Sequence, residues 1–187
     1  MKDLIHELIP HAPQMGLYVA PIIPPDKLRN ALHDYASSMA PEEVVALYDA
    51  TLMGSARDGA VFAGDRFIFQ NNDLEPANEV RYEDIVSVDK KRGFLKGAKV
   101  YLEVNRGRAT FDLTLDFSGK PKALEFLYRF LHEAMLLPVE PRPDPSPGAR
   151  TAAGSDVRAV HQALDKLRAR GHLAEADYRR LLDALDE

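Results

Sequence analysis

Five basic residues crowd into the ten positions from Lys90 to Lys99, and they are the side chains best suited to bind a ligand. They flank the apolar pair Phe94-Leu95 in a predicted loop, and a tip of this kind could insert at an anionic membrane surface or meet an acidic partner. Each cation contributes about 1 kcal/mol near such a surface, so one copy would bind only marginally. A solvated loop whose lysines balance nearby acids is the alternative. The predicted lipid- or anion-binding residues are Lys90, Lys91, Arg92, Phe94, Lys96 and Lys99.

Leucines at helical spacing near the C-terminus form the second candidate. Residues 156–187 predict two short helices separated by Gly171, which stands where a left-handed helix cap belongs. About 30 residues cannot bury much apolar surface alone. The apolar stripes are therefore predicted to close against a partner protein, a second copy or the main domain. The predicted contact residues are Leu164, Leu167, Leu173, Tyr178, Leu181, Leu182 and Leu185.

Patterns typical of catalysis or of bound metals and cofactors are weak or missing in the sequence. The six histidines form no His-x-His or His-Glu-x-x-His pattern, and the chain has no cysteine. Ser55 follows Gly54 without the Gly-x-Ser-x-Gly elbow, and Gly54–Gly59 lacks the Lys-Ser/Thr of a phosphate loop. Glu83 and Asp84 could form an acid–base pair, but 29 acidic residues make any such pair unspecific. We therefore predict a non-enzymatic protein with no catalytic residues, no cofactor and no metal.

Charge and hydropathy restrict the partners and the compartment. The formal net charge of −5 and the pI near 5.7 argue against a dedicated nucleic-acid binder, whose surface is usually basic. Residues 1–10 lack the uninterrupted apolar core of a signal peptide. No apolar run approaches the roughly 20 residues that span a bilayer. These features, with the missing cysteines, predict a cytoplasmic protein that contacts another protein, a second copy or the membrane periphery.

The elements that must position these residues begin with a proline-rich region. Residues 1–9 predict a short helix, and the prolines from Pro10 to Pro25 predict an extended arm that packs over its own domain or on a neighbouring subunit. A helix is predicted over residues 26–37, followed by a break over 38–43. These 43 residues are expected to form an arm and helix outside the main domain.

Strand periodicity follows from Val44. Strands are predicted over 44–48, 60–63, 66–70, 80–88, 99–104 and 109–117, with Asp58-Gly59 as a hairpin signal. The alternation over 109–117 places Phe111, Leu113, Leu115 and Phe117 on one face, which is typical of an antiparallel sheet with one wet face. Pro121 then begins a predicted helix with a wide apolar stripe. Residues 138–155, rich in proline, predict a linker.

This order of elements resembles bacterial pleckstrin-homology-like (PH-like) domains of the YokE-like type. The residues that carry the resemblance are Ala46–Leu52, Ser55–Phe62, Arg66–Phe69 and above all Val80–Val88, where Tyr82-x-Asp84-Ile85 is typical of the bacterial branch. The tail resembles the short C-terminal helical hairpin called SHOCT in its leucines, Gly171 and Tyr178. Ala174 and Leu182 depart from that pattern, which usually has a Thr or Ser and a Lys there.

The resemblance implies an α+β fold, a PH-like antiparallel β-barrel or sandwich capped by a C-terminal helix, plus a tethered two-helix hairpin. The expected divisions are an arm and helix (1–43), a PH-like domain (44–137), a linker (138–155) and a SHOCT-like hairpin (156–187). Both families are seen as binding or oligomerising modules. They imply a bacterial scaffold for protein–protein contact or self-assembly, with anionic-lipid binding through the Lys90–Lys99 loop as the alternative.

Overall fold

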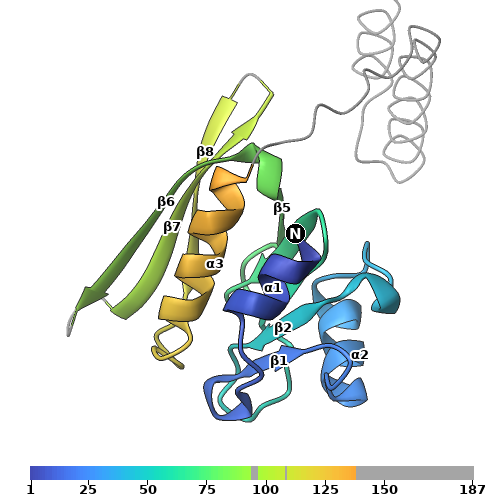
Figure 1. The fold of residues 1–187 in the computed structure, drawn as a ribbon. Helices are drawn as coiled ribbons and strands as arrows, with labels where there is room; N and C mark the ends of the chain where they lie inside the picture. Colours follow the sequence, from blue (N-terminus) through green and yellow to red (C-terminus); the bar gives the residue numbers. More distant parts are fainter. Residues whose placement is uncertain (94–96, 108, 138–187) are drawn as a thin grey trace, which may run out of the picture. The chain divides into compact units, whose positions relative to one another are not determined.

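The architecture is that of a computed structural model, and residues 1–93, 97–107 and 109–137 are described. The chain divides into two units, Met1–Pro138 and Val139–Glu187. All described residues belong to the first unit, which is drawn in colour in Figure 1. The predicted linker (138–155) and hairpin (156–187) lie outside the described residues.

Five short antiparallel strands form the first sheet, here called sheet A, and each pairs with its neighbour in the sequence. The Asp58-Gly59 hairpin signal lies between the second and third strands, which are joined by a loop over residues 50–58. Gly59 has a φ of 141°, and a Cβ atom there would lie 1.9 Å from the Tyr48 carbonyl oxygen, so the third strand can begin only with glycine. The strands are β1 (Leu17–Val19), β2 (Ala46–Asp49), β3 (Gly59–Phe62), β4 (Arg66–Gln70) and β5 (Asn78–Arg81).

Three longer antiparallel strands form sheet B, in the order β6-β7-β8. They are β6 (Ile85–Gly93), β7 (Gly97–Arg106) and β8 (Ala109–Asp116). The register places Tyr101 of β7 opposite Thr114 of β8, and Glu103 opposite Asp112. Alternate residues of β7, Val100, Leu102 and Val104, are buried, whereas Glu103 is exposed. Sheet B therefore has one apolar face and one polar face, as the alternation predicts.

Three α-helices complete an α+β fold: α1 (Lys2–Leu8), α2 (Pro25–Asp34) and α3 (Leu124–Leu136). Figure 1 shows α3 lying between sheet B and α1, and it packs against both β6 and β7. Three short 3-10 helices lie in the connections, at Pro13–Met15 (η1), Pro41–Glu43 (η2) and Tyr82–Asp84 (η3). Within the described residues the two sheets remain separate and do not close into a barrel.

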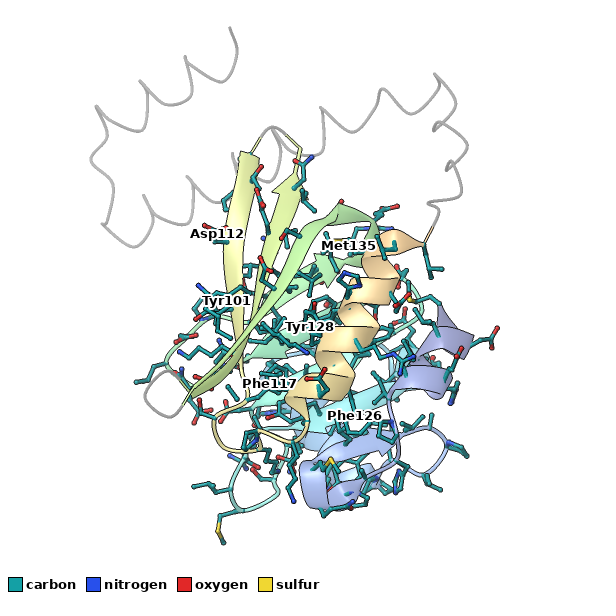
Figure 2. All side chains as sticks on the ribbon, turned by 60° about the vertical axis from the view of Figure 1, so that its left-hand side comes forward. Tyr101, Asp112, Phe117, Phe126, Tyr128 and Met135 are labelled. Carbon is teal, nitrogen blue, oxygen red and sulfur yellow. The ribbon has the colours of Figure 1, made fainter. Side chains whose placement is uncertain are left out.

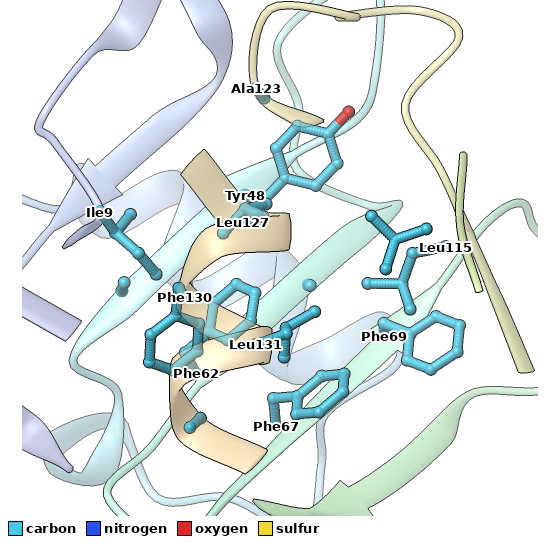
Figure 3. Close-up of a cluster of buried hydrophobic side chains, with 14 of the residues drawn as sticks. Ile9, Tyr48, Phe62, Phe67, Phe69, Leu115, Ala123, Leu127, Phe130 and Leu131 are labelled. Carbon is cyan, nitrogen blue, oxygen red and sulfur yellow. The ribbon is translucent and has the colours of Figure 1, made fainter. Parts of the chain in front are cut away.

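Sheet A is buried on both faces, which explains why β2 and β3 have no exposed residue. One face carries Leu47, Val61 and Ile68. They form a small core with Ala31 of α2 and with Tyr35, which directly follows that helix. The other face contributes to the main core with sheet B, α1 and α3. Figure 3 shows this main core, where Phe130 of α3 lies against aromatic side chains of sheet A.

The predicted strand over residues 80–88 is wrong, because it is two strands in different sheets. β5 ends at Arg81 in sheet A, η3 turns the chain at Tyr82–Asp84, and β6 begins at Ile85 in sheet B. The Tyr82 ring is buried in the main core and its hydroxyl donates a hydrogen bond to the Ala63 carbonyl, 3.1 Å away. This inward aromatic fixes the corner between the sheets. The sequence carries no signal for this break, because Tyr82–Asp84 contains neither glycine nor proline.

The N-terminal residues contribute to the sheet and core, whereas the sequence predicted an arm outside them. Leu17–Val19 form β1, which pairs with β2. Ile5 and Leu8 of α1 are buried in the main core, and α1 packs against α3. The dense prolines hid β1 because its three residues are too few to show a period. The arm therefore lies on its own unit, one of the two positions expected for it.

Other predicted elements agree with the structure to within a few residues. β4 covers the predicted 66–70, α2 ends three residues before the predicted end of its helix, and α3 buries the predicted leucine stripe. One side chain of the last predicted strand differs. Leu115 and Phe117 are buried, but Phe111 is 46% exposed, because it lies near the far end of sheet B.

Candidate functional site

The described parts of the basic segment, up to Gly93 and from Gly97, lie in strands β6 and β7 rather than in the predicted loop. Lys90, Lys91 and Arg92 lie in β6, and Lys99 lies in β7. The Lys90 ammonium is 2.5 Å from Glu125 Oε1 and 4.3 Å from the centre of the Tyr128 ring. This lysine therefore contacts α3, which packs against β6.

The next lysines also contact their own chain. Lys91 Nζ lies 4.7 Å from the centre of the Tyr101 ring, and Lys99 Nζ lies 3.4 Å from Asp116 Oδ2. Phe94 and Lys96 lie outside the described residues, as do all the predicted contact residues of the tail, Leu164, Leu167, Leu173, Tyr178, Leu181, Leu182 and Leu185. Among the described cations of the segment, Lys90 and Lys99 thus pair with a carboxylate, and Lys91 lies over an aromatic ring of the same protein.

A polar cleft of about 430 Å³ lies where the β4–β5 connection meets β8 and the polar face of sheet B. Figure 2 shows Tyr101 and Asp112 on the side of sheet B away from α3. The charged groups that line the cleft are three carboxylates, those of Glu75, Asp112 and Asp116, and the ammonium of Lys99. Sequence analysis did not indicate this region, because the residues of its two walls are at least 21 positions apart in the chain, as Asn78 and Lys99 are.

Asn71 holds the two walls of the cleft together. Its Nδ2 donates a hydrogen bond of 2.8 Å to the Thr114 carbonyl, and its Oδ1 accepts one of 3.0 Å from the Asp116 backbone N–H. One amide side chain thereby occupies two backbone groups of β8, much as a neighbouring strand would. The contact leaves the rest of β8 without a strand partner on that side.

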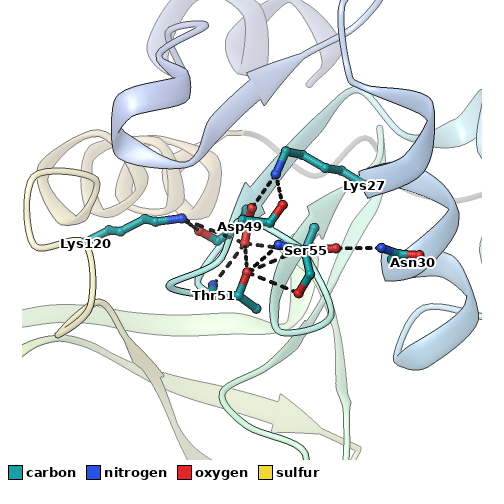
Figure 4. Close-up of polar contacts among 8 residues, drawn as sticks. Lys27, Asn30, Asp49, Thr51, Ser55 and Lys120 are labelled. Atoms are coloured by element: carbon teal, nitrogen blue, oxygen red, sulfur yellow. Dashed lines mark hydrogen bonds and ion pairs between the residues drawn. The ribbon is translucent and has the colours of Figure 1, made fainter.

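The most buried polar group in the described unit is the carboxylate of Asp49, at the end of β2. Lys27 Nζ of α2 donates to Asp49 Oδ2 at 2.8 Å, and Lys120 Nζ donates to the Asp49 carbonyl at 2.6 Å. Thr51 donates to Oδ1 through both its backbone N–H (3.0 Å) and its hydroxyl (2.6 Å). Figure 4 shows these groups converging on one carboxylate from three parts of the chain.

The cluster contains two cations around one buried carboxylate, and burial and these charges shift the pKa values of its members. Burial alone would raise the pKa of Asp49, but hydrogen bonds from Lys27 and Thr51 and the charge of Lys120 outweigh it and lower that pKa. Burial lowers the pKa of Lys120, against the attraction of Asp49. Asp49 is therefore ionised at neutral pH and acts as a charged anchor for its surroundings.

The anchor rigidifies the loop over residues 50–58. Thr51 Oγ1 accepts a hydrogen bond of 2.8 Å from the Ser55 backbone N–H, and Asn30 of α2 donates one of 2.9 Å to the Ser55 carbonyl. Lys27 Nζ also donates to the Gly54 carbonyl. Between these tethers, Leu52 and Met53 are 89% and 94% exposed. A tightly held loop thus presents two adjacent apolar side chains to solvent.

Sequence reasoning missed this cluster. The spacing of Asp49, Thr51 and Ser55 is a local signal, because such side chains commonly bond nearby backbone groups in turns. The two lysines could not have been found in the same way, since they are 22 and 71 residues from Asp49.

The described residues contain no group of three or more His, Asp or Glu side chains placed to hold a metal ion. No helix within residues 1–93, 97–107 and 109–137 has the length and apolar character needed to cross a bilayer. Comparisons of this chain with protein-family models, with curated proteins and with solved structures found no match.

Proposed function

We propose that this chain is a non-enzymatic interaction protein, with the unit Met1–Pro138 as a PH-like platform and residues 156–187 as a SHOCT-like hairpin that contacts a partner or a second copy. Two antiparallel sheets followed by an amphipathic helix support the PH-like assignment. The division of the chain after Pro138 supports a separate role for the tail.

The observation that carries the proposal is the rigid display of Leu52 and Met53. Exposed apolar residues on flexible loops are common and need no explanation. Here the loop is tethered by Asp49, Lys27 and Asn30, so its tip loses little conformational entropy when it is bound. Preorganised apolar side chains are typical of protein contact sites rather than of catalytic sites.

The tail and the tip can be tested together in the full chain. We expect deletion of 156–187, and separately Leu52→Ser with Met53→Ser, to lower the oligomer mass measured by light scattering or to abolish the capture of a partner protein. The melting temperature should hardly change in either case, because Leu52 and Met53 are exposed and the core of the first unit is formed by its own residues.

Leu74→Ser is the matched control, because Leu74 is 96% exposed but lies on the loop between β4 and β5. It should leave mass and partner set as in the wild type. If neither the deletion nor the tip variant changes mass or partners, the interaction function is wrong.

Anionic-lipid binding through the β6–β7 hairpin is the alternative proposal. It has less support, because Lys90, Lys91 and Lys99 already contact Glu125, Tyr101 and Asp116. Flotation of the full chain with anionic vesicles, lost in a variant with Lys91→Glu and Arg92→Glu, would favour it over the protein contact.

A further inference from the structure

Among the four sheet edges of the described residues, two are partly occupied by their own chain and a third carries an irregular register. The β1 edge pairs with Ala12, and His11 Nδ1 accepts from the Val19 backbone N–H at 3.4 Å. At the β5 edge, Arg106 donates to the Glu79 carbonyl at 2.6 Å. Proteins block strand edges in this way because free backbone groups recruit other strands.

The remaining edges belong to sheet B, and they differ. β6 has an irregular register between Ile85 and Ser87, and α3 packs against it. A bulge in an edge strand discourages strand addition. β8 has a regular register with β7 along its whole length, and among the described residues it is the side chain of Asn71 that bonds its outward backbone groups.

The directions of the backbone groups, which alternate along an antiparallel strand, show which part of β8 is available to a further strand. The Thr114 carbonyl and the Asp116 N–H point away from β7, since they bond Asn71. Backbone groups of alternate residues point the same way, so those of Thr110 and Asp112 also point outward. Neither has a hydrogen-bond partner among the residues that the structure describes. Figure 2 shows Asp112 at this edge.

The charges beside the β8 edge determine which kind of strand could pair with it. Glu75, Asp112 and Asp116 line the adjacent cleft against the single ammonium of Lys99, and Glu103 lies opposite Asp112 on the same face. Pairing of β8 with β8 of a second copy would bring the Asp112 carboxylates of the two acidic edges toward each other, and like charges across strands are destabilising. A cationic strand has the complementary charge.

We propose that the β8 edge at Thr110–Asp112 accepts an extended, positively charged polypeptide segment as an added antiparallel strand, with its basic side chains over the acidic cleft. The inference rests on the proposed interaction function and names the class of partner at one surface of the platform. Backbone bonds would supply the affinity and the cleft carboxylates the selectivity for charge.

The probe is a short acetylated and amidated peptide of alternating lysine and valine, added to the full chain and followed by amide chemical shifts. We expect a Kd on the order of 1 mM, because only a few backbone hydrogen bonds form. Shift changes should centre on β8. The same peptide with alternate amides N-methylated cannot donate, and should bind at least about tenfold more weakly.

Asp112→Pro tests whether the peptide binds at the β8 edge of the protein. It removes an outward N–H together with the Asp112 carboxylate, and proline is tolerated at a strand edge, so it should weaken binding about tenfold while the melting temperature stays close to the wild type. Asp112→Lys leaves two carboxylates and two ammonium groups in the lining, so it should remove most of the preference for the lysine–valine peptide over a glutamate–valine one. Asp3→Lys, the same charge change in α1, should leave both peptides as in the wild type.

Absence of binding, equal binding of the N-methylated peptide, or equal binding of the glutamate peptide to the wild type would overturn the inference. A concentration-dependent dimer that Asp112→Pro abolishes would overturn it in favour of a second copy. None of these outcomes affects the result of deleting 156–187, so the interaction function and its β8 partner fail separately.

Discussion

Replacing Asp49 with Ala is expected to lower the free energy of unfolding by about 3–5 kcal/mol. The carboxylate is fully buried, and the side chains of Lys27 and Lys120 are only 12% and 19% exposed. Removal leaves two partly buried ammonium groups close together without a counter-charge, and it also removes an acceptor for Thr51 and for the Ala56 backbone N–H. Urea denaturation at neutral pH measures the loss.

Asp65→Ala is the matched control, because Asp65 also pairs with two cations, Arg66 and Arg81, at 3.1 and 3.9 Å. Its side chain is 49% exposed, so solvent screens the pairs and the change should cost no more than about 1 kcal/mol. A loss at Asp49 no larger than at Asp65 would mean that the buried cluster does not anchor the loop.

The same cluster gives a defined pH dependence. Because the pKa of Asp49 is lower in the folded protein than its ordinary value of 3.8, its stabilisation is fully present above 3.8 and is lost as the pH falls through the folded-state pKa. Asp49→Asn should therefore flatten the loss of stability below about pH 4. The difference between the wild type and this variant should be largest at neutral pH.

Local periodicity predicted the elements that depend on local sequence. β4 follows from a short run of β-branched and aromatic residues, and α3 follows from a period of 3.6 residues that presents one apolar face over several turns. β1 could not be predicted, since its three residues are shorter than any period and stand among prolines. The break at Tyr82–Asp84 has no glycine or proline to mark it. Tertiary packing of Tyr82 determines that corner.

For the candidate surfaces, too, the sequence predicted what is local, whereas the contacts between distant residues depend on the fold. The sequence identified the cations from Lys90 to Lys99, but not that Glu125, Tyr101 and Asp116 contact three of them. The β8 cleft joins residues from distant parts of the chain, so no spacing in the sequence could indicate it. In the Asp49 cluster only the local part, Asp49 with Thr51 and Ser55, has a signal in the sequence, whereas Lys27 and Lys120 are distant. Sequence patterns thus located the charges, whereas the fold determined which carboxylates and aromatic rings contact them.

Phe130→Ala is expected to lower the free energy of unfolding by about 3–5 kcal/mol, through lost burial and the cavity that remains. Phe130 is fully buried, and its ring contacts Phe62 of sheet A and Tyr82 of η3 edge-on, with 5.6 Å between ring centres in both pairs. It thereby joins α3 to sheet A and to the corner between the sheets. Thermal and urea unfolding of the full chain measure the change.

Phe126→Ala is the control, because the same truncation on the same helix removes a ring that is only partly buried. It should cost clearly less than Phe130→Ala, since less area leaves water on folding and the vacated space is open to solvent. Equal losses at the two positions would mean that α3 is held mainly by its own helicity or by sheet B. A larger loss at Phe130 would place the joint between the two sheets at this ring, where α3, Phe62 and Tyr82 meet.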